Sequence, residues 1–173
     1  MPAWDWEGRA AAVREAQEAV DRLEGGTGAD WAARRDEAVA AFHAAVDRAW
    51  PSGFFEARER LHEGRATRED LDLLVEFLVA DPVFFRSGYI QESVLRWVKR
   101  APLEPDQAQR LRAVVLDAIE RRHRQYFRRY CSLARALDTP DLRDQVRQRL
   151  ASSDPAVQQH AALVMEGLGG RGR

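Results

Sequence analysis

The sequence has little cysteine, almost no lysine and no long apolar run. Cys131 is the only cysteine in 173 residues, so no intrachain disulfide can form, and a reducing cytoplasm is the expected setting. Apolar stretches such as 73–75 and 83–85 are interrupted by charged residues within a few positions, which argues against a helix that spans a bilayer. The N-terminal residues carry no basic segment followed by an apolar one, so we expect no signal peptide.

The charges are unevenly distributed along the chain. Lys99 is the single lysine against 26 arginines, a ratio typical of GC-rich codon usage that indicates no function by itself. The net charge is −1, but residues 1–80 carry 10 basic and 17 acidic side chains, whereas residues 81–150 carry 15 basic and 9 acidic ones. Such a separation bears on partners and association rather than on fold.

Strand patterns are nearly absent, while helical periodicity recurs with start and stop signals. In the N-terminal part the pattern predicts helices at residues 5–24, 30–50 and 54–63, the second with Asp30 as its N-cap. The glycine-rich segment Gly-Gly-Thr-Gly at residues 25–28 ends the first helix, and the second ends before a Pro-Ser-Gly turn. Further helices are predicted to start at Thr67, Asp81-Pro82, Pro105, Arg121, Thr139-Pro140 and Asp154-Pro155.

Residues 141–169 resemble a HEAT repeat, in which an Asp-Pro turn joins two helices. The second helix of that family begins with a buried valine, continues through a small Ala-Ala pair and closes on Leu-Gly. Gln158 replaces the arginine that usually follows the valine. The matching residues are Asp154, Pro155, Val157, Ala161, Ala162, Leu168 and Gly169.

Two further segments follow the same plan less closely. Residues 68–100 repeat the Asp81-Pro82 turn and have Phe84 after it, but Gly88 and Tyr89 stand where the small pair is expected. Residues 104–138 have the length of a helix pair without an Asp-Pro turn. The resemblance implies neighbouring pairs that stack to close a core, since each pair buries only one face. A helical bundle that uses the same caps is the alternative.

We therefore predict an all-α fold: a helical hairpin plus about three HEAT-like antiparallel helix pairs in a short right-handed α-solenoid. Residues 1–66 are predicted to form the N-terminal hairpin and short helix, residues 67–169 the helix pairs, and residues 170–173 a disordered tail, all within one continuous fold. Trp4 and Trp6 are predicted to pack on the start of the stack as an N-terminal cap. A protein-binding patch is the alternative for these tryptophans.

The predicted helix at residues 121–137 carries most of the positive charge. At 100° per residue the helix has an apolar side, with Arg122 and Arg129 at its border. The other arginines fall in a narrow stripe on the opposite side, and no acidic residue interrupts them. If second helices of neighbouring pairs stand side by side, the end of the preceding helix extends this surface. A row of guanidinium groups is suited to binding a polyanion such as a nucleic-acid backbone. The simpler interpretation is that these arginines form a solvated helix face that binds no partner. The predicted basic strip consists of Arg96, Lys99, Arg100, Arg121, Arg124, Arg128 and Arg135.

DNA-alkylation glycosylases built from HEAT-like repeats offer one specific version of a nucleic-acid function. The resemblance implies a catalytic aspartate and aromatic residues on the basic surface, for which Asp117, Tyr126, Tyr130 and Trp97 are the candidates. Tyr126 and Tyr130 lie on the apolar side of their predicted helix, so packing explains them better. The chain is also short for such an enzyme.

A metal site or a reactive thiol has little support. Glu59/His62 and Glu120/His123 resemble the paired motifs of di-iron bundles, but Glu92 is the only well-spaced further carboxylate, so we predict neither a metal nor a cofactor.

Cys131 flanks the arginine-rich helix, where positive charge could lower its pKa, yet no histidine base stands beside it, so a structural or inert thiol is favoured.

No catalytic motif supports an enzyme. The preferred function is a non-catalytic cytoplasmic adaptor that presents the basic strip to an acidic protein partner. Nucleic acid is the alternative partner, self-association stays open, and no membrane partner is expected.

Overall fold

The computed structural model describes residues 4–121 and 127–169, and the predicted tail at residues 170–173 lies outside them. The described residues form α-helices joined by turns and loops, without a strand, which confirms the all-α prediction for this part of the chain. No described helix is long and apolar enough to cross a membrane. The helices are α1 (Trp6–Asp21), α2 (Ala29–Ala49), α3 (Phe54–His62), α4 (Arg68–Ala80), α5 (Ser87–Val98), α6 (Pro105–Glu120), α7 (Phe127–Ala136), α8 (Pro140–Leu150) and α9 (Pro155–Gly169).

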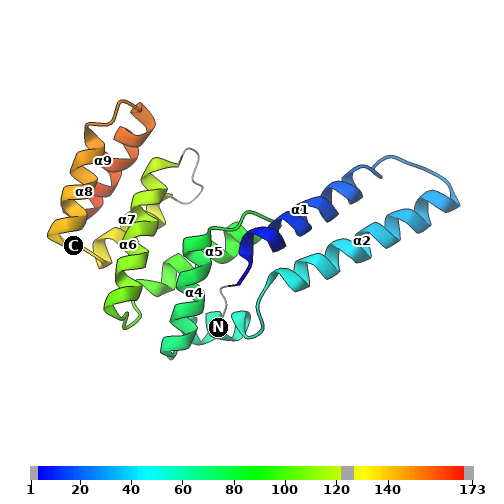
Figure 1. The fold of residues 1–173 in the computed structure, drawn as a ribbon, viewed down its shortest axis with the longest axis horizontal. Helices are drawn as coiled ribbons and strands as arrows, with labels where there is room; N and C mark the ends of the chain where they lie inside the picture. Colours follow the sequence, from blue (N-terminus) through cyan, green and yellow to red (C-terminus); the bar gives the residue numbers. More distant parts are fainter. Residues whose placement is uncertain (1–3, 122–126, 170–173) are drawn as a thin grey trace.

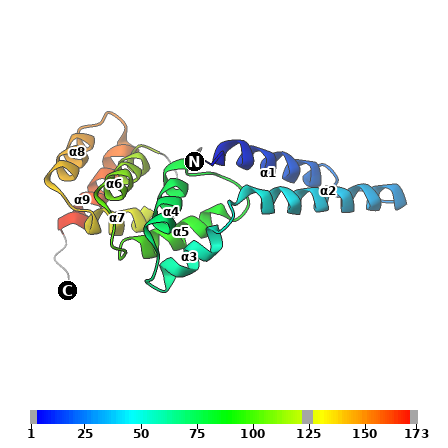
Figure 2. The same cartoon turned by 60° about the horizontal axis from the view of Figure 1, so that its bottom comes forward.

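Helices α1 and α2 form an antiparallel hairpin that projects from the other helices (Figure 1, Figure 2). The turn at its tip is closed by Trp31, whose Nε1 donates a hydrogen bond to the Leu23 carbonyl at 2.6 Å. The indole ring lies so close to Gly26 that a Cβ there would meet it at 2.0 Å. Gly28 caps α2, and Asp30 lies in its first turn, so the predicted N-cap at Asp30 was wrong by two residues.

An aromatic cluster joins the base of this hairpin to the rest of the molecule. Trp6 is buried, with its ring centroid 5.2 Å from that of Phe77 on α4 and 5.7 Å from that of Phe54 on α3. Trp50 follows α2, and its ring centroid lies 4.8 Å from that of Phe54. Trp4 donates from Nε1 to the Ala49 carbonyl at 3.2 Å. Trp4 and Trp6 thus pack against the neighbouring helices, and their role as the cap of a repeat stack stays a prediction.

Helices α4 to α9 pack in two rows, and α3 packs against α4 and α5. α4 contacts α6 and α6 contacts α8, while α5 contacts α7 and α7 contacts α9 (Figure 2). The first helices of the three predicted pairs are therefore neighbours, and so are the second helices. Both rows bury apolar side chains in one continuous core, whose fully buried members include Leu74, Leu95, Leu111, Leu133 and Leu142.

Most predicted helix starts agree with the structure because their caps are local. The Thr67 hydroxyl accepts from the Asp70 N–H at 3.3 Å, and the Asp70 carboxylate accepts from the Thr67 N–H at 2.9 Å. Prolines open α6, α8 and α9, where their missing N–H costs nothing.

The predicted helix start at Asp81-Pro82 was wrong. Asp81 instead ends α4 as a C-cap in the left-handed region, with φ 47°, and α5 begins at Ser87. The Asp81 carboxylate accepts from Gln91 and pairs with Arg121, so it is not free to cap a helix. The N-cap of α5 is Arg86, without a side-chain cap hydrogen bond, and the Ser87 hydroxyl accepts from the Phe84 N–H at 3.1 Å in the turn before the helix.

Candidate cationic binding site

The end of helix α5 places two cations side by side. Lys99 is the C-cap of α5, and the Arg100 N–H donates to the Trp97 carbonyl at 3.0 Å. Pro102 follows, and because it lacks an N–H the helix does not resume there. Lys99 and Arg100 thus stand where the helix dipole favours positive charge.

Helix α7 packs against α5 and contributes a third cation to the same surface. A hollow of about 280 Å³ is lined by Lys99, Arg100, Ser132, Arg135 and Ala136. Three residues of the predicted basic strip therefore meet here, and we call Lys99, Arg100 and Arg135 the cationic cluster.

Glu92 neutralises two arginines that lie beside this cluster, Arg96 and Arg129. Its Oε1 lies 2.7 Å from Nη2 of Arg96 and 2.7 Å from Nη2 of Arg129. The hydrogen bonds from Arg96 and then Arg129 hold the pKa of Glu92 below its usual value. Arg96, a member of the predicted strip, is therefore engaged within the protein. Arg129, which sequence reasoning placed at the border of the apolar face, reaches the site because α7 lies against α5.

The cationic cluster itself has no such acidic partner among residues 4–121 and 127–169, where neither Lys99 nor Arg100 forms an ion pair. Arg135 donates from Nε to the Gly167 carbonyl at 2.7 Å and keeps its charge. Burial lowers the pKa of Lys99, and the charges of Arg100, Arg129, Arg135 and Arg96 lower it further. Cations held together this closely repel one another, and a bound anion would relieve that repulsion.

The other members of the predicted strip do not join the cluster. α6 ends at Glu120, and Arg121 follows with extended backbone, so the predicted helix over 121–137 was wrong at its start. The Arg121 guanidinium pairs with Asp81 and, at 2.8 Å, with Asp117. Arg124 lies outside the described residues. Arg128 is exposed on α7, two turns before Arg135.

A second hollow of about 270 Å³ adjoins the cluster, and we call it the aromatic pocket. The end of α3 and the loop after it provide one wall, and the end of α5 provides the other. The centroids of the His62 and Trp97 rings lie 4.4 Å apart, and Arg58 lies over the Trp97 ring at 5.2 Å. Its lining is Leu61, His62, Glu63, Gly64, Ala66, Trp97, Arg100, Ala101 and Pro102.

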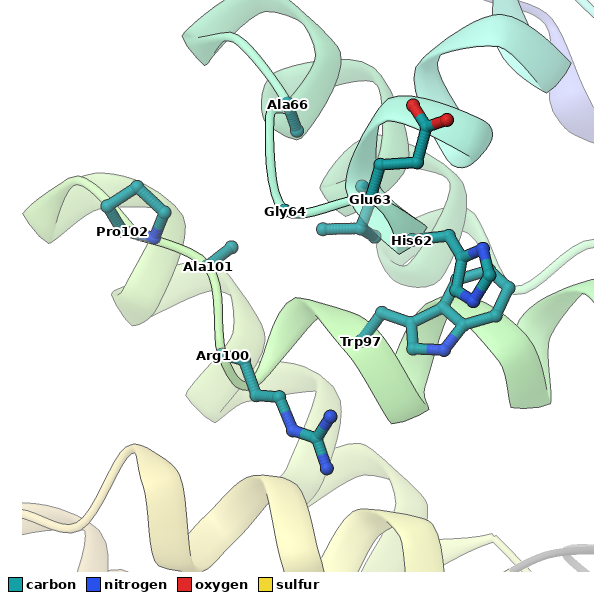
Figure 3. A pocket seen from close by; sticks show the side chains of 9 residues that line it. His62, Glu63, Gly64, Ala66, Trp97, Arg100, Ala101 and Pro102 are labelled. Carbon is teal, nitrogen blue, oxygen red and sulfur yellow. The ribbon is translucent and has the colours of Figure 1, made fainter.

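Arg100 belongs to both hollows, so the aromatic pocket and the cationic cluster form one site. Figure 3 shows His62 against Trp97 on one side of the pocket, with the Arg100 side chain pointing away from Pro102. No sequence pattern predicts this pocket, because His62 and Trp97 meet only through the packing of α3 on α5.

The candidate residues for catalysis lie apart among the described residues: Asp117 pairs with Arg121, whereas Trp97 lines the aromatic pocket. Tyr130 is buried in the core, as the packing interpretation predicted, and Tyr126 lies outside the described residues. Burial raises the pKa of the Cys131 thiol above its usual value and outweighs the opposing effect of the nearby Arg128 and Arg135 charges. The described residues contain no group of three His, Cys, Asp or Glu side chains arranged for a metal, and His123 lies outside them.

No protein-family model matches the chain, and comparisons with curated proteins and with solved structures find no match either.

Proposed function

We propose that the protein is a non-catalytic adaptor of HEAT-like architecture, which binds an acidic segment of another protein through its cationic cluster. The observation that supports this proposal is the group of Lys99, Arg100 and Arg135 around one hollow, without a carboxylate partner among the described residues. Guanidinium groups bind carboxylates with paired hydrogen bonds, and a lysine adds a point charge beside them.

The HEAT-like part of the proposal rests on the order of contacts. α4, α6 and α8 are neighbours in one row, and α5, α7 and α9 in the other, as in an array of stacked helix pairs. The match of 141–169 to the repeat pattern supports the same interpretation. Under this proposal the cationic cluster lies between the second helices of two adjacent pairs.

A short acidic segment fits the site better than a nucleic-acid duplex. A duplex presents a long, regular row of phosphates and requires cations spread along it. Among the described members of the strip, Arg121 is engaged by Asp81 and Asp117, and Arg96 by Glu92. Lys99, Arg100 and Arg135 form a compact group, and Arg128 stands apart on α7. Carboxylates on a flexible segment can converge on such a group.

The test is a titration of a labelled glutamate-rich peptide, followed by fluorescence anisotropy. Replacing Arg100 and Arg135 by glutamine should weaken binding by at least about tenfold, because hydrogen bonds to charged groups contribute about 1.5–3 kcal/mol. The matched control is Arg34→Gln with Arg35→Gln, which removes two charges from the exposed part of α2. This control should stay within about twofold of the parent, because charges well beyond a Debye length are screened.

The same assay with single- and double-stranded oligonucleotides tests the alternative partner. Tighter binding to an oligonucleotide than to the peptide, with a salt slope of about −0.9 per neutralised phosphate on a duplex, would reject the acidic-protein proposal in favour of nucleic acid. Equal loss of peptide binding in the cluster variant and in the control variant would also reject it.

A further inference from the structure

The aromatic pocket is a defined hollow beside the cationic cluster, lined by side chains from two segments of the chain. Its volume of about 270 Å³ lies just below the range of about 300–1,000 Å³ typical of sites for drug-sized ligands. It therefore has room for one large side chain and not for a whole cofactor. Its apolar lining comes from two separate segments, with Leu61 and Ala66 on one and Ala101 and Pro102 on the other.

The polar groups around the pocket favour a neutral ring over a charged group. The Glu63 carboxylate on the rim pairs with Arg65, so its charge is largely neutralised. The Arg100 side chain points away from Pro102 toward the yellow helix (Figure 3), so its charge lies at the junction with the cluster and outside the apolar part of the pocket. The rings of Trp97 and His62 offer edges and faces for offset contacts.

We infer that the aromatic pocket receives an aromatic side chain from the acidic segment, so that the protein recognises a motif with carboxylates next to one aromatic residue. This inference rests on the proposed function, because the carboxylates of the same segment occupy the cationic cluster. Charge selects acidic segments in general, and the pocket selects among them. Buried aromatic anchors surrounded by polar contacts are the usual source of such selectivity.

The experiment compares three peptides of equal length by isothermal titration calorimetry. One is glutamate-rich with a central phenylalanine, the second has alanine at the centre, and the third keeps phenylalanine but replaces glutamate by glutamine. The acidic phenylalanine peptide should bind at least about tenfold more tightly than the acidic alanine peptide, because burying a phenyl ring contributes on that order. The glutamine peptide should bind more weakly than both.

A pocket-filling variant tests where the ring binds. Ala66→Phe should abolish the preference for the phenylalanine peptide over the alanine peptide, since Ala66 lines the pocket and the added ring would fill it. Ala113→Phe, at an exposed position of α6, is the matched control and should keep the preference.

Indole N–H signals in NMR spectra of the unmodified protein give a readout that does not depend on a variant folding. The Trp97 signal should shift on addition of the acidic phenylalanine peptide. The Trp31 signal at the far tip of the hairpin should not.

The outcomes separate this inference from the proposed function. If both acidic peptides bind equally and the Trp97 signal does not move, the pocket inference fails while the adaptor proposal stands. If neither acidic peptide binds, both fail. If single-stranded oligonucleotides shift the Trp97 signal and bind more tightly than the peptides, the pocket stacks nucleobases and the acidic-motif inference is rejected.

Discussion

At the scale of single residues, a buried carboxylate joins helix α3 to the start of α4. Arg60 donates to Asp70 through Nε at 2.7 Å and through Nη2 at 2.5 Å, and Asp70 also accepts from the Thr67 N–H. The hydrogen bonds from Arg60 are the main reason that the pKa of Asp70 falls from 3.8 to about 2. The same pairing raises the pKa of Arg60. The ionised form of Asp70 is therefore stabilised by folding.

The lowered pKa of Asp70 predicts a pH-dependent contribution to stability. Because the folded pKa lies below the unfolded value, the contribution is complete above about pH 4 and is lost as the pH falls toward 2. Its size is about 2–3 kcal/mol, from a shift of roughly two units at about 1.4 kcal/mol each. Asp70→Asn should lower the free energy of unfolding by that amount at pH 7, measured by urea denaturation.

The difference between Asp70→Asn and the parent should shrink as the pH is lowered below 4, and a difference that stays constant down to pH 3 would contradict the mechanism. Asp106→Asn is the matched control, because Asp106 is exposed and lies 4.0 Å from Arg68. A surface pair of this kind contributes about 0–1 kcal/mol, so the control should change little at any pH.

At the scale of elements, Gln107 connects two neighbours in the first row of helices. It lies on α6, is fully buried and donates from Nε2 to the Asp72 carboxylate of α4 at 2.7 Å and to the Arg68 carbonyl at 3.3 Å. Its Oε1 accepts from the Glu104 N–H at 3.0 Å. One side chain thus caps α6 and fixes it against α4.

Replacing Gln107 by leucine should be strongly destabilising although leucine is apolar and of similar size. The change leaves the Glu104 N–H and the Arg68 carbonyl without these partners, at a cost of about 1–3 kcal/mol for each group that water does not reach. We expect a loss of about 2 kcal/mol in the free energy of unfolding, measured by urea denaturation. Gln109→Leu, at an exposed position of the same helix, is the control and should stay within about 0.5 kcal/mol.

The elements that sequence reasoning predicted well are those whose ends are determined locally. The cap formed by Thr67 and Asp70 and the proline starts of α6, α8 and α9 depend only on residues within one turn. Asp81 carries the same kind of signal, yet Gln91 and Arg121 hold it at the end of α4. Because these partners lie 10 and 40 residues away, a capping pattern that covers one helical turn cannot predict their contacts with Asp81.

The candidate site was predictable only in part for the same reason. Helical spacing indicates the arginine stripe to which Arg135 belongs. Lys99 and Arg100 join it only through the repeat plan, which places second helices side by side, and they line one hollow with Arg135. The pairing of Glu92 with both Arg96 and Arg129 depends on how α5 meets α7. Because sequence spacing gives the direction of a side chain and not its partner, it cannot separate cations available to a ligand from those already neutralised.

At the scale of the whole molecule, the hairpin of α1 and α2 is an acidic extension of a more basic body. Residues 4–50 carry ten acidic and six basic side chains, and the hairpin projects away from α4 to α9 (Figure 1). Away from its base the hairpin is only two helices thick, so little apolar surface is buried there. Its position depends on the aromatic cluster around Trp6, which includes Trp50, Phe54 and Phe77.

The last prediction concerns the attachment of this hairpin. Trp6→Ala removes a buried indole that contacts α3, α4 and the residue after α2, and such truncations cost about 3–5 kcal/mol. Urea denaturation should show that loss, and hydrogen exchange should be faster in α1 and α2 than in α6. Trp31→Ala is the control, because Trp31 packs only on the tip of the hairpin, so exchange should rise there without a comparable loss of global stability. Equal destabilisation by the two variants would mean that the hairpin and the remaining helices unfold as one cooperative unit, against the prediction that the base alone secures it.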